Sequence, residues 1–421
     1  MSNEDIEKKV REMARDAKRG SRKLASCSTE TKNRILYKIA DELIAQKKFI
    51  AAENNKDLSA GREKGLSSAM LDRLELNDKV IESMVTGLRE IAALPDPVGE
   101  IDDMKRRPSG ILVGRMRIPL GVVGMIYESR PNVTVDAAAL CLKSGNATIL
   151  RGGSEAIYSN LALAGIMQQV LAEEKIDPAV IQVIPFTDRH GVNVLLTLEE
   201  DIDLIIPRGG EGLIRFVSQN SRIPVLKHYK GVCHCYIDSD ADIDMGVPIV
   251  MNSKTQRPGV CNALEGLLVH KDIAPSFLPV VARELFKAGV EMRGCAASRA
   301  LVPEIKEAND EDWGSEFLEL ILAVKVVEDM DEAIEYIGEY GSQHTEIIIT
   351  NSYANSQRFL REVDASAVMV NAATRFNDGG QFGLGAEIGI STTKLHAYGP
   401  MGLEELTSRK FIVYGEGEIR A

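Results

Sequence analysis

The sequence is poor in aromatic residues and carries no excess of positive charge. Phe, Trp and Tyr together make up 5% of the 421 residues, and there is a single tryptophan. Lysine and arginine (50) are outnumbered by aspartate and glutamate (62), which gives a net charge of −12. Nucleic-acid grooves need a basic surface, often interleaved with aromatic rings. We therefore expect no nucleic acid among the partners of this protein.

Long apolar runs and closely spaced cysteine pairs are also missing. No stretch reaches the roughly 20 uninterrupted apolar residues of a membrane span, and residues 1–20 are densely charged without the apolar core of a secretion signal. The cysteines are too sparse for a disulfide framework and include no Cys-x-x-Cys pair. They are Cys27, Cys141, Cys233, Cys235, Cys261 and Cys295. We therefore expect a cytoplasmic protein with reduced thiols and no membrane partner.

One local cluster, Cys233-His234-Cys235, has the residue types of a metal site. Residues 232–237 are expected to form a strand, which directs Cys233 and Cys235 to one face and His234 to the other. The three side chains cannot then converge on one ion. We therefore predict that the protein has no metal site.

The features that are present begin with a helical periodicity. Apolar residues within 5–93 recur at helical spacing, as Ile35 and Ile39 do. Residues 100–118 then alternate apolar and charged side chains, which predicts an exposed hairpin or arm. The chain therefore opens with a helical part followed by a short β element.

From residue 120 onward, short buried strands alternate with helices, and a second alternation starts near residue 263. This pattern is typical of parallel sheets covered on both faces. With 44% hydrophobic residues the chain can fill large cores, so we predict an α/β fold with two lobes and a ligand cleft between them. The predicted strands are 121–126, 147–150, 180–184, 202–206, 264–269, 323–327, 346–350 and 367–371. The predicted helices are 136–142, 158–171, 277–288, 330–340 and 355–363.

Two glycine-rich turns follow strands of the first lobe, although no Gly-x-Gly-x-x-Gly motif follows its first strand. They read Arg151-Gly-Gly-Ser154 and Pro207-Arg-Gly209-Gly210-Glu-Gly212. Glycine lets the backbone approach a phosphate, a helix N-terminus offers unpaired N–H groups, and the adjacent arginine adds positive charge. Such turns are also common where no ligand binds, so nucleotide binding is one of two interpretations. A third tract, 376–389, is either an anion-binding flap or a plain connection to the C-terminal tail.

Cys261 lies in the most informative segment, Gln256-Arg-Pro-Gly-Val-Cys-Asn-Ala263. The Pro-Gly pair enforces a turn just before the thiol, and an apolar run follows it. A thiol in such a turn can act as a nucleophile. It can also be a small buried apolar residue, as free cysteines often are.

Five longer blocks bear on this choice, because they resemble the gamma-glutamyl phosphate reductases of the aldehyde dehydrogenase superfamily. The blocks span nearly the whole chain in the order found in that family, and they are 119–132, 143–154, 255–262, 340–346 and 379–403. The resemblance implies an aldehyde dehydrogenase-like fold with a cofactor-binding lobe, a catalytic lobe and a small β oligomerisation arm. The implied parts are 1–102 (helical part of the cofactor-binding domain), 103–120 (arm), 121–230 (sheet of the cofactor-binding domain), 231–397 (catalytic domain) and 398–421 (C-terminal oligomerisation tail).

The resemblance also implies a reaction, the NADPH-dependent reduction of L-glutamyl 5-phosphate to L-glutamate 5-semialdehyde and phosphate in proline biosynthesis. The thiolate of Cys261 would attack the acyl phosphate and form a thioester, which hydride then reduces. Serine rather than a carboxylate at position 154 is compatible with the phosphorylated ribose of NADPH. The residues assigned to the cofactor are Arg151, Ser154, Gly209, Gly210 and Glu316.

The asparagine that stabilises the oxyanion in the superfamily has two candidate positions here. Counting without gaps from Gly121 leads to Arg130, whereas Asn132 has the right chemistry two residues later. We predict that Asn132 serves the oxyanion. Arg130 and Arg257 are then predicted to bind the substrate, since arginine pairs well with phosphate and carboxylate groups.

Two sequence features depart from related patterns. Residues 226–231 contain no glutamate, whereas hydrolytic aldehyde dehydrogenases carry there the base that activates water. The cations in this segment, Lys227 and Lys230, belong either to the site or to the solvated surface. Tyr398 stands where the family carries arginine, so the contact of that arginine is weakened or is taken over by a neighbour such as Arg409.

The resemblance further implies a homo-oligomer, and it makes glutamate 5-kinase a candidate partner that hands over the unstable acyl phosphate. Two other functions stay open from the sequence. One is a CoA-acylating aldehyde dehydrogenase, which also lacks the hydrolytic glutamate. The other is a catalytically silent scaffold with the same fold.

Overall fold

The structure, a computed structural model, describes every residue except Ser129 and Ala421. The chain divides into two compact units. Unit 1 comprises Met1–Lys227, Gly383–Gly389 and Met401–Ala421, and unit 2 comprises His228–Phe382 and Ile390–Pro400. No helix in the described part of the chain is long and apolar enough to cross a membrane.

The first 93 residues, all of which the structure describes, form the five helices that begin unit 1. They are α1 (Asn3–Leu24), α2 (Thr29–Ala45), α3 (Lys47–Glu63), α4 (Ser68–Leu74) and α5 (Asp78–Ala93). Ser2 starts α1 with a capping box, in which Asp5 N donates to Ser2 Oγ at 3.2 Å and Ser2 N donates to Asp5 Oδ2 at 3.1 Å. The periodic residues Ile35 and Ile39 are buried on one face of α2. The predicted helical opening is therefore confirmed.

A four-stranded parallel sheet in the order β5-β4-β3-β6 forms the rest of the core of unit 1. Its strands are β3 (Val122–Tyr127), β4 (Ala147–Arg151), β5 (Ile181–Val183) and β6 (Leu204–Arg208). The accompanying helices are α6 (Asn132–Lys143), α7 (Ile157–Glu173), α8 (His190–Leu195) and α9 (Glu211–Asn220), with 3-10 turns η1 (Ser154–Ala156) and η2 (Pro178–Val180). Because β4 and β6 run parallel on either side of β3, the two glycine-rich turns that follow them lie at the same edge of the sheet.

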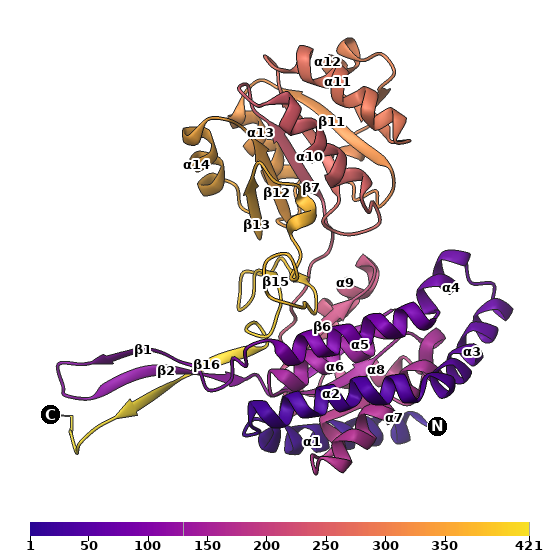
Figure 1. Ribbon diagram of the computed structural model, residues 1–421, viewed down its shortest axis with the longest axis vertical. Coiled ribbons are helices and arrows are strands. Elements are labelled where there is room, and N and C mark those ends of the chain that lie inside the picture. The colour runs from indigo at the N-terminus through magenta and orange to yellow at the C-terminus, as the bar shows by residue number, and fades with distance from the viewer. Residues whose placement is uncertain (129, 421) are drawn as a thin grey trace. The chain divides into compact units, whose positions relative to one another are not determined.

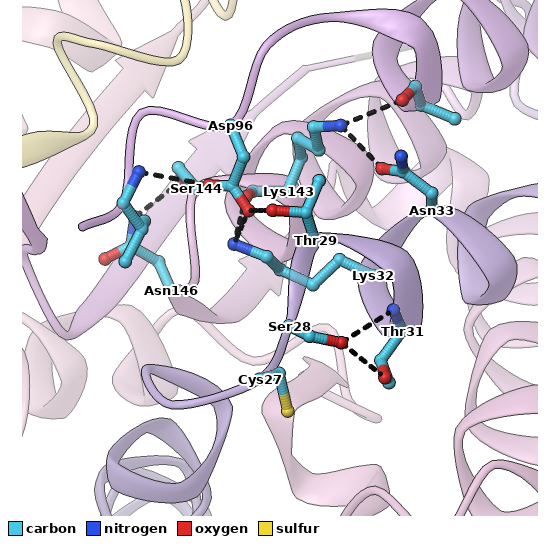
Figure 2. A network of polar contacts seen from close by, with 12 residues as sticks. Cys27, Ser28, Thr29, Thr31, Lys32, Asn33, Asp96, Lys143, Ser144 and Asn146 are labelled. Atoms are coloured by element: carbon cyan, nitrogen blue, oxygen red, sulfur yellow. Dashed lines mark hydrogen bonds and ion pairs between the residues drawn. The ribbon is translucent and has the colours of Figure 1, made fainter. Parts of the chain in front are cut away.

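A buried polar network joins the N-terminal helices to α6 (Figure 2). Lys32 Nζ of α2 lies 2.5 Å from Asp96 Oδ2 and donates to the carbonyl oxygen of Lys143 at 3.0 Å. Lys143 Nζ donates in turn to Asn33 Oδ1 at 2.5 Å and to the carbonyl oxygen of Ala92 at 2.8 Å. Buried charges are tolerated only when they are paired and hydrogen-bonded. The network therefore fixes the C-terminal end of α6, the helix that carries the predicted oxyanion residue at its other end.

A three-stranded antiparallel ribbon extends from unit 1 (Figure 1). Its strands are β1 (Ile101–Arg106), β2 (Leu112–Pro119) and the C-terminal β16 (Thr407–Tyr414), in the order β1-β2-β16. The arm predicted over 100–118 is therefore present, and β16 pairs with it along its whole length. Phe411, Val413 and Tyr414 of β16 are exposed.

Unit 2 is built on a seven-stranded parallel sheet in the order β10-β9-β11-β8-β7-β12-β13. Its strands are β7 (Cys233–Ile237), β8 (Leu264–His270), β9 (Glu291–Gly294), β10 (Lys306–Glu307), β11 (Ile321–Val327), β12 (Thr345–Ile349) and β13 (Ala367–Val370). Its helices are α10 (Ile243–Thr255), α11 (Ala274–Lys287), α12 (Ala296–Leu301), α13 (Met330–Tyr340) and α14 (Tyr353–Glu362), with 3-10 turns η3 (Asp312–Gly314) and η4 (Thr374–Phe376). The predicted strands and helices of the second lobe are all present. The sequence did not predict β9, β10, α10 and α12.

Two apolar cores cover the two faces of this sheet. Cys235 and Phe277 belong to one core, and Tyr236 and Phe359 belong to the other. Neighbouring residues of β7 thus enter different cores, as the period of two in a strand requires. A parallel sheet buried on both faces explains why the strands of this unit read as apolar runs.

The glycine-rich tract 376–389 runs from the end of unit 2 into unit 1. Asp378 Oδ1 accepts a hydrogen bond from Gly380 N at 3.0 Å. Gly385 has φ +77°, and a Cβ at this position would lie 2.4 Å from the Leu94 side chain, so both backbone and packing require glycine. Two short strands follow, β14 (Ile390–Ser391) and β15 (Gly399–Pro400), which pair antiparallel.

Candidate active site

Cys261 lies in the loop 256–263, here called the cysteine loop, which joins α10 to β8 of unit 2. Pro258 and Gly259 lie in a turn, as predicted, and a second turn around Cys261 and Asn262 is closed by a hydrogen bond from Ala263 N to the Val260 carbonyl oxygen at 3.0 Å. Cys261 itself is half-buried, whereas Cys233 and Cys235 are buried. The cysteine that the sequence selected is therefore partly exposed, unlike those of β7.

The backbone of Cys261 is held by the start of β7 and the residues before it. Cys233 Sγ donates to the carbonyl oxygen of Cys261 at 3.2 Å. A Cβ built on Gly231 would lie 2.0 Å from that oxygen and 2.7 Å from the Cys261 Cα, so the close approach requires glycine. Gly231 N in turn donates to Glu316 Oε1 at 2.9 Å. The predicted cofactor residue Glu316 is thus one hydrogen bond away from the glycine that supports the nucleophile.

A second segment, 374–377, is fastened to the cysteine loop by side-chain hydrogen bonds. Arg375 Nε donates to Gln256 Oε1 at 2.7 Å, and Asn262 Nδ2 donates to the carbonyl oxygen of Asn377 at 2.9 Å. Sequence reasoning missed Arg375, which stands one residue before the glycine-rich tract 376–389. The signal for it was present, because an arginine in a short segment after the last strand of a sheet stands where parallel α/β sheets bind ligands.

A buried ion pair supports the cysteine loop from both ends. Lys254 Nζ, at the end of α10, lies 2.6 Å from Glu265 Oε2 in β8, and both side chains are buried. Burial raises the pKa of Glu265 and lowers the pKa of Lys254, and the partner's charge opposes each shift. Glu265 Oε1 also accepts a hydrogen bond from Leu318 N at 3.1 Å. The two ends of the loop are therefore fixed relative to the segment that contains Glu316.

The two cysteines of β7, Cys233 and Cys235, lie in surroundings that favour a structural role over a reactive one. Burial raises the pKa of Cys233 and of Cys235, which keeps both thiols protonated. His234 points away from them and its Nδ1 lies 3.0 Å from Glu346 Oε2. The alternation of faces predicted for 232–237 is therefore confirmed, and no group of His, Cys, Asp and Glu residues suited to a metal ion occurs in the described part of the chain.

In the first glycine-rich turn of unit 1, backbone carbonyl oxygens fix the position of the Arg151 side chain. Arg151 Nη1 donates to the Gly152 carbonyl oxygen at 2.9 Å and its Nη2 donates to the Thr187 carbonyl oxygen at 3.0 Å. Burial is the main cause that lowers the pKa of this guanidinium, which nevertheless stays charged. Ser154 begins η1 and is exposed. An exposed hydroxyl beside a fixed arginine fits a site for a charged ribose substituent.

The second turn leads directly into α9, whose first turn has no side-chain cap. A Cβ built on Gly210 or Gly212 would meet no atom within 4 Å, so the space in front of this helix N-terminus is open. Glu128 reaches the same place, because its Oε2 accepts a hydrogen bond from Gly210 N at 3.0 Å and would lie 2.5 Å from a Cβ on Gly209. A phosphate at this helix N-terminus would therefore lie beside the carboxylate of Glu128, which already accepts the hydrogen bond from Gly210 N.

The two candidates for the oxyanion lie at the start of α6 in unit 1. Asn132 is the first residue of the helix, and its Nδ2 donates to Asp136 Oδ2 at 3.2 Å. Burial raises the pKa of Asp136 to about 6, and the bond from Asn132 opposes this shift. Arg130 is exposed, and its carbonyl oxygen accepts a hydrogen bond from Val133 N at 3.1 Å. The amide of Asn132 is thus oriented by the helix itself.

The segment that lacks the hydrolytic glutamate carries a histidine instead. His228 Nδ1 lies 2.8 Å from the Ile390 carbonyl oxygen, and its ring stands edge-on to His344 at a centroid distance of 5.7 Å. Burial and the neighbouring His228 lower the pKa of His344 to about 3, so this ring is neutral at physiological pH. Neither ring provides the carboxylate base of a hydrolytic enzyme.

Tyr398, the departure from the family pattern, contacts an acidic residue of its own unit. Its hydroxyl donates to Asp364 Oδ1 at 3.4 Å, and Lys394 Nζ lies 2.6 Å from Asp364 Oδ2. Arg409 lies in β16 and pairs with Asp102 at 3.0 Å. Lys394 thus supplies the ionic partner of Asp364, and Arg409 is occupied within the ribbon.

Comparisons with known proteins bear on the family and the fold of this chain. The aldehyde dehydrogenase family model matches residues 3–315. A gamma-glutamyl phosphate reductase of Desulfotalea psychrophila is 62% identical over 416 residues, which cover 99% of this chain and 100% of that protein. A protein of the same name from Geotalea daltonii is 60% identical over 415 residues, with 99% of each chain covered.

A solved structure gives the same result for the fold. The crystal structure of gamma-glutamyl phosphate reductase from Thermotoga maritima matches with a TM-score of 0.96 and 48% identity, covering 98% of this chain and 100% of that one. The fold predicted from the sequence, two α/β lobes with a small β arm, is therefore confirmed. The chain belongs to the aldehyde dehydrogenase family and, within it, to the gamma-glutamyl phosphate reductases.

Proposed function

We propose that this protein reduces L-glutamyl 5-phosphate to L-glutamate 5-semialdehyde and phosphate with NADPH, a step of L-proline biosynthesis. Relatives that carry the corresponding name match the chain from end to end. The observation that carries the proposal is the half-buried thiol of Cys261 in a loop that is held from several sides. A fixed, accessible thiol suits the attack on an acyl phosphate.

In the proposed mechanism the thiolate of Cys261 attacks the acyl carbon, the bond from this carbon to the phosphate oxygen breaks, and phosphate leaves. The oxyanion that forms accepts hydrogen bonds from the Cys261 N–H and, as we assign it, from the Asn132 amide. The product of this step is a thioester on Cys261. When bound, the nicotinamide cofactor supplies the hydride that reduces this thioester to the aldehyde. Because residues 226–231 offer no carboxylate to activate water, the thioester is protected from hydrolysis.

The residues proposed for the cofactor fit a dinucleotide. Gly210 leaves open space for a phosphate in front of α9, Gly209 lies where the Glu128 carboxylate approaches the backbone, and Arg151 and Ser154 lie where we place the ribose end. Glu316, through its contact with Gly231, lies beside the support of the nucleophile, where we place the nicotinamide ribose. We propose that the enzyme prefers NADPH to NADH, because Arg151 and Ser154 place a cation and a hydroxyl, rather than a carboxylate, at these positions.

Ser154→Glu tests this cofactor assignment. We expect the ratio of kcat/KM for NADPH to that for NADH to fall about tenfold, because a carboxylate repels the 2′-phosphate by roughly 1 kcal/mol or more near a protein surface. The measurement is initial rates with each cofactor in turn. Ser83→Glu, which adds the same charge at an exposed position of α5, is the matched control and should leave the ratio unchanged. An unchanged ratio in Ser154→Glu would place the ribose elsewhere.

The reverse reaction tests the identity of the acyl acceptor. Oxidation of glutamate semialdehyde with NADP should depend on added inorganic phosphate, and arsenate should replace it, because no carboxylate in 226–231 activates water. The measurement is NADPH formation at graded phosphate concentrations, with sulfate at equal ionic strength as control. A full rate without phosphate would mean a hydrolytic aldehyde dehydrogenase. A rate that requires CoA instead would mean an acylating one, and no turnover under any condition would mean a silent scaffold.

The ribbon β1-β2-β16 supports a proposal about assembly. We assign it to contacts between copies of this chain in a homo-oligomer, because it exposes apolar side chains on a paired sheet. The second proposed partner is a different protein, a glutamate 5-kinase that delivers the unstable acyl phosphate directly. Sedimentation analysis of the purified protein checks the first assignment.

A further inference from the structure

We propose that Arg375 and Arg257 together bind the phosphoryl group of the substrate beside Cys261, which makes Arg375 a specificity-determining residue. The inference rests on the proposed function, because it assigns the phosphate of L-glutamyl 5-phosphate to a particular pair of side chains. All the residues involved belong to unit 2, and most of them to the cysteine loop and the segment 374–377.

The geometry places Arg375 over the cysteine loop. Its Nε donates to Gln256 Oε1 at 2.7 Å, which fixes the planar guanidinium beside the neighbouring residue, Arg257. The segment is anchored further by the bond from Asn262 to Asn377 at 2.9 Å, one residue beyond the nucleophile. The two hydrogen bonds therefore attach the segment on both sides of Cys261. The guanidinium uses only Nε in this contact, which leaves the Nη1 and Nη2 edge for a ligand.

The charges around Arg257 and Arg375 favour the binding of an anion. Among the described residues, no carboxylate lies within ion-pairing distance of Arg257 or Arg375. Burial lowers the pKa of Arg375, and the charge of Arg257 lowers it further, while Asp378, Cys261 and Cys233 act in the opposite direction. Asp378 is already engaged, because its Oδ1 accepts hydrogen bonds from Gly380 N and Gln381 N. Two guanidinium groups that repel each other beside a thiol are stabilised when a dianion binds both.

The phosphoryl group is the anion that fits this position. It is attached to the carbon that Cys261 attacks, so it must lie beside the thiol when the sulfur–carbon bond forms and the carbon–oxygen bond breaks. Three carbon atoms separate that centre from the substrate's α-carboxylate. A guanidinium offers paired N–H groups that match phosphate oxygens, and it keeps its charge when half-buried. Binding of the leaving phosphate by two arginines would also stabilise the charge that accumulates on it.

A comparison of two alkylating reagents tests the arginine pair without turnover. Iodoacetate is an anion and iodoacetamide is neutral, and both alkylate the same thiolate with loss of iodide. The ratio of their rates at Cys261, measured by mass spectrometry, therefore reports the local positive charge rather than the thiol pKa. We expect Arg375→Gln to lower the iodoacetate-to-iodoacetamide ratio about fivefold, whereas Arg375→Lys should keep it near the wild-type value. Inorganic phosphate should slow alkylation of the wild type more than that of Arg375→Gln.

The matched control is Arg361→Gln, which removes one exposed arginine of α14 in the same unit. It should leave the ratio unchanged, and a fall as large as that in Arg375→Gln would overturn the proposal by showing a general charge effect. Arg257→Gln should lower the ratio in the same way as Arg375→Gln. It serves as the second variant if Arg375→Gln does not fold.

Steady-state kinetics of the reverse reaction then identify the anion. Arg375→Gln should raise the KM for phosphate at least tenfold and leave the KM for glutamate semialdehyde within twofold of wild type. A rise confined to the KM for semialdehyde would assign the arginine to the α-carboxylate and overturn our assignment. Failure of the proposed function itself would be recognised separately, because wild-type oxidation would then not depend on phosphate while the alkylation ratios would still report the arginine pair.

Discussion

Cys261→Ser should lower turnover in both directions by on the order of 10³ or more, because a serine hydroxyl without a strong base cannot replace the thiolate. The substitution replaces the sulfur atom with a slightly smaller oxygen atom, and the contacts of this residue with Cys233 and Gly231 involve its backbone. The melting temperature and cofactor affinity should therefore stay close to those of the wild type. The measurements are initial rates of semialdehyde oxidation, a thermal melt and a cofactor titration.

Cys27→Ser is the matched control for this substitution. Cys27 is also half-buried, but it belongs to unit 1 and follows α1, with its Sγ bonded to the Lys23 carbonyl oxygen at 3.7 Å. It should retain full activity. If Cys261→Ser kept comparable activity while Cys27→Ser lost it, the nucleophile would have to be sought elsewhere.

Local sequence patterns predicted those helices and strands whose start, end and apolar periodicity can all be recognised within the segment itself. The helix predicted over 330–340 is α13 with the same bounds, because Asp329 caps it by accepting a hydrogen bond from Glu332 N and an apolar face repeats along it. Helix α10 was missed although it leads into the cysteine loop. It contains Pro248 in its interior, which local rules read as a helix breaker.

The site could be predicted from sequence only where one segment carried the chemistry. The turn around Cys261 was recognisable because its proline and glycine stand directly before the thiol. The position of Arg375 after the last strand marked it as a possible ligand-binding residue, but its relation to the nucleophile could not be predicted, because that relation arises from bonds between segments more than 100 residues apart. Glu128 is a similar case. It follows β3 in the chain, and only the pairing of β3 with β6 brings its carboxylate to Gly210 at the start of α9.

Glycines illustrate the same limit. The sequence singled out Gly209 and Gly210 because they form a pair in a strand-to-helix turn. Gly231 carries no local signal of that kind, and its φ is not in the left-handed region. Its importance comes from its distance to the Cys261 backbone, which only the folded chain defines.

Gly231→Ala should therefore impair catalysis although it adds a single methyl group. The new Cβ would stand 2.0 Å from the Cys261 carbonyl oxygen and 2.7 Å from its carbonyl carbon, distances at which backbone must move. A displacement of about 1 Å at the reacting group can cost about 10²-fold in rate. We expect kcat to fall by about that factor, and overpacking to lower the free energy of unfolding by about 1–3 kcal/mol.

The comparison with Gly338→Ala separates this effect from a general effect of added bulk. A Cβ on Gly338 of α13 would meet no atom within 4 Å, and alanine favours the helix, so this variant should be fully active and slightly more stable. Activity and the free energy of unfolding, measured by urea denaturation, are compared for both variants at a temperature where each is folded. Because Gly231 contacts the nucleophile's backbone directly, the Gly231→Ala enzyme should have a lower kcat even when it is fully folded. A folded Gly231→Ala enzyme with the wild-type kcat would contradict the view that this close contact positions the thiol.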